Sequence, residues 1–134
     1  MEVDITVDDR AVRAMLDRAP AQIDRALRAA MDDATVYVLR QMQTYPPQRT
    51  GSAYKRTGTL GRSWSRRIDG SGADITGIVG SNANIAPYNR VVQDRTRQAR
   101  VHRGRWANTA QTVSERSVRP INDMFAARIR AALG

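Results

Sequence analysis

An apolar stripe between residues 12 and 42 constrains the fold of this chain more than any other feature. Its members recur at intervals of three, four or seven residues: Val12, Leu16, Ile23, Leu27, Met31, Ala34, Val38 and Met42. This spacing places them on one face of an α-helix. Pro20 interrupts the stripe, and because proline lacks a backbone N–H it either kinks the helix or divides it. We favour a break near Ala19, followed by a helix that ends at about Gln43.

The residues before the stripe predict a short strand. Apolar and polar side chains alternate over residues 2–7, which is typical of a half-buried strand. Asp8 or Asp9 can then cap the helix, because a carboxylate there accepts hydrogen bonds from the N–H groups of the first turn. We therefore expect a strand to precede the long helix.

The segment after the stripe cannot continue the helix. Pro46 disfavours helical geometry at Tyr45, and Pro47 removes a second hydrogen-bond donor. We expect residues 45–62 to form an extended basic loop or arm, since a loop of this length inside a compact domain usually serves a partner.

A β-hairpin is predicted over residues 62–80. Trp64, Arg66 and Ile68 alternate with polar residues, and a turn-forming run of Asp, Gly and Ser follows. We expect this small antiparallel sheet to pack on the long helix. On a hairpin, Trp64 is more often a core residue than a platform for stacking bases.

A second amphipathic helix is predicted in the last third of the chain. Its apolar positions repeat at three or four residues: Val118, Ile121, Phe125, Ile129 and Leu133. The helix begins either at a Thr112 cap supported by Glu115 or at Ser117, close to Pro120.

The 134 residues fit a single domain, residues 1–134. Aromatic side chains make up only 5% of the chain, so the core is built mainly from smaller apolar side chains. The predicted elements define an α+β fold: an N-terminal strand, a long helix interrupted at Pro20, a long basic loop, a small antiparallel sheet packed on the helix, and a C-terminal amphipathic helix. A modest core of this kind gains stability by association with copies of itself or with neighbours.

Two basic segments interleaved with aromatic residues are the candidates for a functional surface. No acid lies between Asp33 and Asp69, and none between Asp94 and Glu115. The first segment is the loop after the long helix, and residues 95–106 form a second basic loop. Arginine and aromatic side chains together bind phosphates and bases, and they also anchor protein interfaces. The candidate assembly-interface residues are Arg49, Tyr54, Lys55, Arg56, Arg62, Arg95, Arg97, Arg100, His102, Arg103, Arg105 and Trp106.

The net charge of +9 comes from 22 basic and 13 acidic residues. Residues 1–33 hold eight acids and five arginines, a net of −3, which leaves +12 for residues 34–134. Such asymmetry suits a subunit that meets an acidic surface, whether a phosphate backbone, an acidic protein ring or the next subunit. The competing interpretation is plain solubility combined with a compositional bias toward arginine.

Residues suited to catalysis or metal binding are few. The chain has no cysteine, and its one histidine, His102, lies among arginines that disfavour both a protonated imidazole and a bound metal ion. Asp32 and Asp33 point in different directions on a helix, and Asp8 and Asp9 are better explained as a cap. We expect no enzymatic activity, no metal and no cofactor. We also expect no membrane insertion, because no apolar run approaches the roughly 18 residues of a membrane span.

Five short motifs occur in a characteristic order. They are Tyr45-Pro46-Pro47, Tyr54–Trp64, Val79–Asn82, Ala86-Pro87-Tyr88 and His102–Trp106. In this order, over about half of the chain, they resemble the gene-product-10-like tail-completion proteins of tailed bacteriophages. Many members of that family follow the Ala-Pro-Tyr motif with a Val-Glu-Phe-Gly-Thr-like run, where this chain has Asn89–Asp94.

The resemblance implies a structural virion protein of the tail or neck that is assembled in the host cytoplasm and has no catalytic residues. It implies a ring of six or twelve copies at the head–tail junction. The partners would be portal, adaptor or stopper proteins and tail-terminator or tail-tube proteins, with packaged DNA as a further contact. Tail terminator and minor capsid protein are alternatives within the virion class. Outside that class, the main alternative is a nucleic-acid-binding protein that uses the same basic loops.

Overall fold

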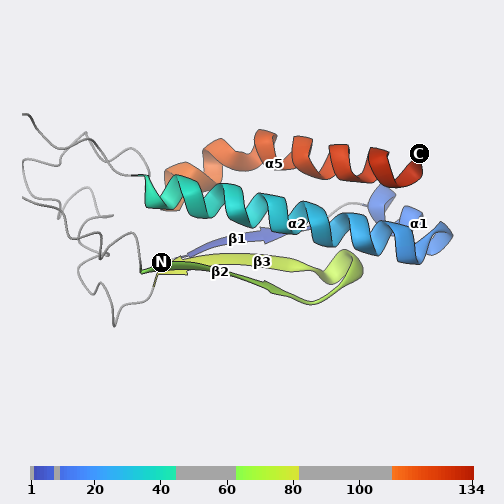
Figure 1. Cartoon of the computed structure of the whole chain (residues 1–134), viewed down its shortest axis with the longest axis horizontal. Coiled ribbons are helices and arrows are strands. Elements are labelled where there is room, and N and C mark those ends of the chain that lie inside the picture. The colour runs from blue at the N-terminus through green and yellow to red at the C-terminus, as the bar shows by residue number, and fades with distance from the viewer. Residues whose placement is uncertain (1, 8–9, 45–62, 82–109) are drawn as a thin grey trace, which may run out of the picture.

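The computed structural model describes residues 2–7, 10–44, 63–81 and 110–134. The elements in order are β1 (Glu2–Thr6), α1 (Arg10–Arg18), α2 (Pro20–Gln43), β2 (Trp64–Asp69), the 3-10 turn η1 (Gly72–Asp74), β3 (Thr76–Ser81) and α5 (Ala110–Leu133). Figure 1 shows α2 in the middle, with α5 along one side and a three-stranded sheet along the other. The predicted α+β arrangement is confirmed.

The break predicted near Ala19 is also confirmed. α1 ends at Arg18 and α2 begins at Pro20, with Ala19 in a non-helical conformation between them (φ −141°, ψ 66°). The Ala19 N–H still donates to the Met15 carbonyl at 2.9 Å, and its carbonyl accepts from the Ile23 N–H at 3.0 Å. Pro20 opens the first turn of α2, where a missing N–H is tolerated. The proline therefore divides the helix at little cost in hydrogen bonds.

The central strand of the antiparallel sheet is β3, in the order β1-β3-β2. Val3 of β1 and Arg66 of β2 both lie opposite Val79, which fixes the register on both sides of β3. Because side chains alternate along a strand, these three residues share the face that packs on α2. The predicted N-terminal strand and hairpin thus belong to one sheet.

The hairpin turn is fastened to the first turns of α2. Gly70 has a φ of 76°, and a Cβ there would lie 2.6 Å from the Asp74 carbonyl oxygen, so the turn requires glycine at this position. The backbone N–H of Gly72 donates to Asp24 Oδ1 at 2.7 Å. This bond joins the tip of the sheet to the N-terminal part of α2.

Helix α2 forms the centre of the core. Nine of its residues are buried: Ile23, Ala26, Leu27, Ala30, Met31, Ala34, Thr35, Val38 and Met42. They include six of the eight stripe positions, while Val12 of α1 is buried and Leu16 is half-buried. The buried residues cover about half of the helix circumference at 100° per residue. This arc is wide enough for α2 to pack against the sheet and α5 at once.

Helix α5 packs through a different face from the one that its apolar spacing predicts. Val113 and Ser117 are buried, whereas Val118 is 57% exposed and Leu133 is 56% exposed. Within the predicted stripe only Ile129 is buried, and two further members are half-buried. The face of α5 that packs on α2 is therefore rotated away from the predicted apolar stripe.

The start of α5 was also wrongly predicted. The helix begins at Ala110, before both Thr112 and Ser117, and Pro120 lies inside it. Pro120 removes one backbone hydrogen bond. The helix continues through it because buried residues on both sides of the proline hold α5 in place.

The sheet approaches α2 closely at Gly77. A Cβ on Gly77 would lie 2.6 Å from Met31 Sδ and 2.6 Å from Thr35 Cγ2. Both neighbours are fully buried, so neither can turn into solvent to make room. A side chain at this position would have to push β3 away from the helix.

We predict that Gly77→Ala lowers the free energy of unfolding by about 1–3 kcal/mol, because overpacking a dense core strains its neighbours. Urea unfolding monitored by circular dichroism measures the change. Gly134→Ala adds the same methyl group after the end of α5, where a Cβ meets nothing within 4 Å. Gly134 has a positive φ of 80°, but a backbone change there disturbs no packed element, so the midpoint should not change. An unchanged midpoint for Gly77→Ala would contradict the close packing.

Candidate interaction sites

The chain leaves and re-enters the described body at four points when it passes through residues 45–62 and 82–109. These points are Thr44, Ser63, Ser81 and Ala110. Trp64 pairs with Ser81 in the sheet, and Arg116 Nη2 donates to Gln41 Oε1 at 3.0 Å, which brings the first turns of α5 to the end of α2. Figure 1 shows all four points at one end of the molecule, away from α1 and the C-terminus. We call this end the junction pole.

The formal charge of the chain resides in the two segments that begin and end at the junction pole. Residues 45–62 and 82–109 hold ten basic residues and one acid, Asp94, which gives a net charge of +9. The remaining residues hold twelve basic and twelve acidic residues and are formally neutral. The entire excess of positive charge thus lies in the two segments that begin and end at the junction pole, and the rest of the chain is formally neutral.

All twelve candidate interface residues, from Arg49 to Trp106, lie in these segments and outside the described residues. The predicted helix caps Asp8 and Asp9 also lie outside them. The common attachment of both segments at the junction pole depends on the three-dimensional fold, and charge patterns in the sequence did not reveal it.

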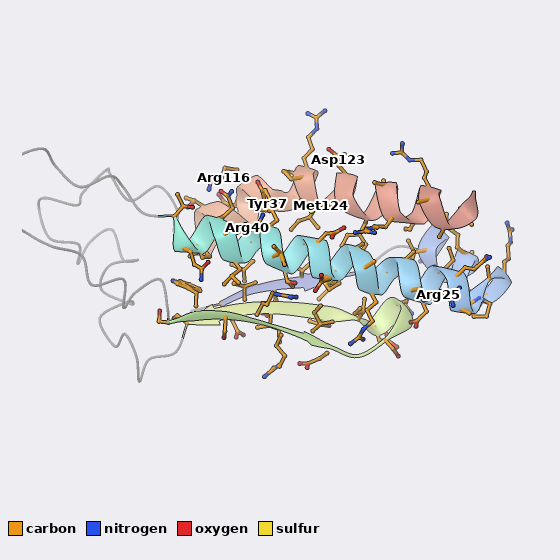
Figure 2. The ribbon with its side chains drawn as sticks, viewed as in Figure 1. Arg25, Tyr37, Arg40, Arg116, Asp123 and Met124 are labelled. Carbon is orange, nitrogen blue, oxygen red and sulfur yellow. The ribbon has the colours of Figure 1, made fainter. Side chains whose placement is uncertain are left out.

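Trp64 anchors the chain where it re-enters the body at the junction pole. Its side chain is 4% exposed, which confirms the prediction that it is a core residue. The indole Nε1 is buried and has no hydrogen-bond partner among the described residues. Figure 2 shows Tyr37 and Arg40 of α2 and Arg116 of α5 toward the same end. A buried aromatic side chain thus holds the start of β2 in the core at this end of the molecule.

Asp32 and Asp33, adjacent on α2, bind opposite layers of the fold. Asp32 Oδ1 accepts a hydrogen bond from Arg66 Nη1 of β2 at 2.6 Å. Asp33 accepts two from Arg128 of α5, at 2.7 Å from Nε and 3.1 Å from Nη2. The prediction that these carboxylates point in different directions is confirmed. They attach the sheet and α5 to α2 and do not converge on a common site.

Arg66 also satisfies a buried polar group. Its Nη1 lies 3.3 Å from Thr35 Oγ1, and the Thr35 hydroxyl donates to the Met31 carbonyl at 2.9 Å. Thr35 is fully buried, where an unpaired hydroxyl would be costly. An inward-pointing arginine on an edge strand also disfavours pairing of β2 with a foreign strand.

The bond with Asp33 raises the pKa of Arg128 above its ordinary value, through the side-chain hydrogen bond first and the charge of Asp33 second. A cation whose pKa is raised on folding contributes stability at every pH below its unfolded pKa. That contribution is lost only as the pH rises through the still higher folded pKa. Titration of Arg128 therefore leaves the attachment of α5 to α2 intact at neutral and mildly alkaline pH.

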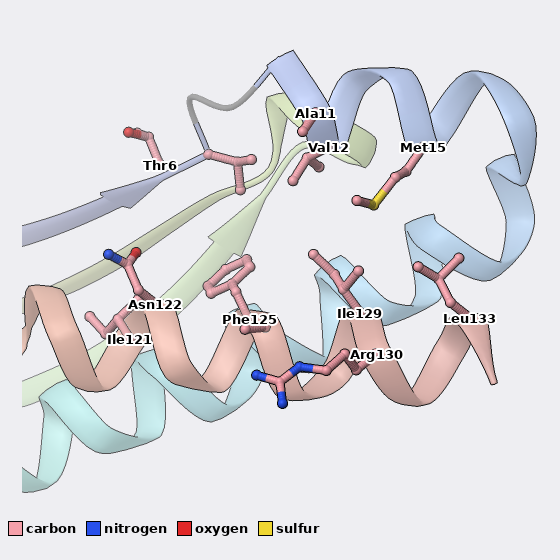
Figure 3. A pocket seen from close by; sticks show the side chains of 12 residues that line it. Thr6, Ala11, Val12, Met15, Ile121, Asn122, Phe125, Ile129, Arg130 and Leu133 are labelled. Carbon is pink, nitrogen blue, oxygen red and sulfur yellow. The ribbon is translucent and has the colours of Figure 1, made fainter.

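A second candidate site is an apolar groove between α1 and α5. It encloses about 710 Å³ and is lined by Thr6, Val7, Ala11, Val12, Met15, Ile121, Asn122, Phe125, Ala126, Ile129, Arg130 and Leu133. Figure 3 shows Phe125, Ile129 and Leu133 on one wall, facing Val12 and Met15 on the other. The sequence identified the α5 residues as an apolar stripe, but not the space in front of them.

Other kinds of site are not assembled in the part of the chain that the structure describes. There, no group of three acidic or histidine side chains could hold a metal ion. The sole histidine, His102, lies outside that part.

The described helices were also compared with the length and hydropathy of a membrane span. None of them is both long and apolar enough to cross a bilayer.

Comparison with known proteins adds no assignment. No protein-family model, curated protein or solved structure matches this chain.

We predict that Asp32→Asn lowers the free energy of unfolding by about 0.5–1 kcal/mol, because partly exposed ion pairs contribute little individually. The difference should shrink at high salt, which screens the pair. Asp17→Asn makes the same chemical change at an exposed residue of α1 and should have no measurable effect. Urea unfolding at low and high salt measures both variants, and equal destabilisation of the two would contradict a specific role for Asp32.

Proposed function

We propose that this protein is a structural component of a tailed-phage virion that joins head and tail. In this role it forms a ring, and the arginine-rich segments at the junction pole contact neighbouring copies and the adjoining connector or tail proteins. The observation that carries the proposal is the attachment of the whole +9 charge to one pole of a neutral body. The resemblance of five motifs to tail-completion proteins indicates which kind of assembly the protein would join.

Charge segregated in this way favours an acidic partner surface. Arginine binds carboxylates with paired, directional hydrogen bonds, so it supports contacts that must also fix orientation. A neutral body with its own paired charges can keep one shape while the basic segments meet different neighbours. These are the properties required of a subunit between two unlike assemblies.

The same charge distribution also favours nucleic acid as a partner. Ten basic residues on two segments of one pole could neutralise several phosphates. We rank this second because arginines interleaved with tyrosine and tryptophan also anchor protein interfaces, and the motif order resembles an assembly protein. The two functions differ in how binding depends on salt.

Particle assembly in the absence of this protein tests the proposed function. Without this protein, the phage that encodes it should accumulate filled heads and complete tails that remain separate in electron micrographs. The wild-type protein supplied in trans should restore joined particles, and mass spectrometry should detect it in purified virions. Absence from virions would overturn the proposal.

A matched pair of variants tests the role of the basic segments in the same complementation experiment. Replacing Arg49, Arg56 and Arg62 by Gln should lower the titre of infectious particles at least about tenfold, because interface arginines carry a large share of binding energy. Replacing Arg10, Arg18 and Arg119 by Gln removes the same charge from exposed positions of the body and should leave the titre within about twofold. Equal titres would contradict the assignment of these segments.

The affinity for DNA distinguishes an assembly protein from a nucleic-acid-binding protein. The purified protein should bind duplex DNA only in the non-specific range, with dissociation constants of about 10⁻⁴–10⁻⁶ M at physiological salt. Fluorescence anisotropy over a series of salt concentrations measures this. Much tighter binding to one sequence or structure of DNA, lost in the Arg49, Arg56, Arg62 variant, would favour the nucleic-acid-binding function instead.

A further inference from the structure

The apolar groove lies at the opposite end of the body from the junction pole, and the proposed function does not use it (Figures 1 and 3). Its long wall is formed by Ile121, Phe125, Ile129 and Leu133 of α5. From Ile121 to Leu133 the helix rises about 18 Å at 1.5 Å per residue. The groove is therefore long.

The composition and size of the groove match small-molecule sites. Nine of the twelve lining residues are apolar, and the other three are Thr6, Asn122 and Arg130. Such sites are commonly about 300–1,000 Å³, mainly apolar, with a few polar groups that fix orientation. The volume of about 710 Å³ falls within that range.

Arg130 is the only charged residue among the described residues that line the groove. Its side chain is exposed, and it forms no ion pair or hydrogen bond with another described residue. Arg128, two positions earlier, is held instead by Asp33 on the opposite side of α5. The guanidinium of Arg130 is thus available to an anion at the margin of an apolar surface.

We propose that this groove binds a medium-chain alkyl carboxylate. The alkyl chain lies along Phe125 and Leu133, where it covers apolar surface that is otherwise partly exposed. The carboxylate accepts hydrogen bonds from Arg130, with Asn122 and Thr6 as further polar groups of the lining. Binding does not involve the junction pole and is independent of the proposed function.

Titration of the full-length ¹⁵N-labelled protein with decanoate tests the proposal. We expect saturable, one-to-one shifts of backbone amides in residues 121–133 and around Met15. Arg130→Gln should weaken decanoate binding about fivefold, the effect of losing a charge-assisted bond at an exposed position. Binding of 1-decanol, which lacks the charge, should be weaker and unchanged by this substitution.

Two variants serve as controls. Arg119→Gln removes a charge from the same helix outside the groove and should not alter binding. Ala126→Leu fills the groove and should abolish binding of both probes, and Ala11→Leu does so from the other wall if Ala126→Leu fails to fold. Absence of saturable shifts, or equal effects of Arg130→Gln and Arg119→Gln, would overturn the proposal. If decanoate does not bind and Ala126→Leu blocks particle assembly, the groove is a protein interface instead.

Discussion

The fold depends on the burial of α2 from two sides. The sheet meets the side of α2 that carries Met31 and Thr35, where Gly77 allows close approach, and α5 meets the side that carries Asp33 and Gln41. A two-stranded hairpin such as β2–β3 is marginal alone, and a single helix gains most of its stability from packing. Neither outer layer could persist without α2 between them. The two adjacent carboxylates fix how these layers are oriented, since exposed ion pairs add little to stability but restrict geometry.

Charge serves two separate purposes in this molecule. Within the body, acids and arginines are equal in number, and several form pairs between layers, such as Asp32 with Arg66 and Asp33 with Arg128. In residues 45–62 and 82–109, basic residues outnumber acids ten to one. A net charge of +9 spread over a small core would oppose its compaction by self-repulsion. Placing that charge in the two segments leaves the rest of the chain formally neutral and so avoids this self-repulsion in the core.

The sequence predicted those parts of the fold whose apolar spacing is regular. The stripe of α2, the break at Pro20 and the hairpin around Trp64 were correct, because each follows from local geometry. The packing face of α5 was not predictable in this way. Val113 lies outside the regular spacing of the predicted stripe and Ser117 is polar, yet both are buried because α5 packs on α2. The twelve candidate interface residues were selected as basic segments interleaved with aromatic residues. The attachment of these segments at one pole follows from tertiary structure that local spacing does not encode.

The apolar groove is a consequence of the break at Pro20. Because the break changes the direction of the chain, the nine-residue helix α1 packs on α2 and on the hairpin turn. The apolar face of α5 that carries Phe125 and Leu133 is therefore left partly uncovered. The two ends of the molecule therefore differ in chemistry, with positive charge attached at the junction pole and an apolar groove beside Arg130 at the other end. Rings are built from head-to-tail contacts, in which two different surfaces of each copy meet. The asymmetry of the body is thus compatible with the ring proposed for it, irrespective of what the groove binds.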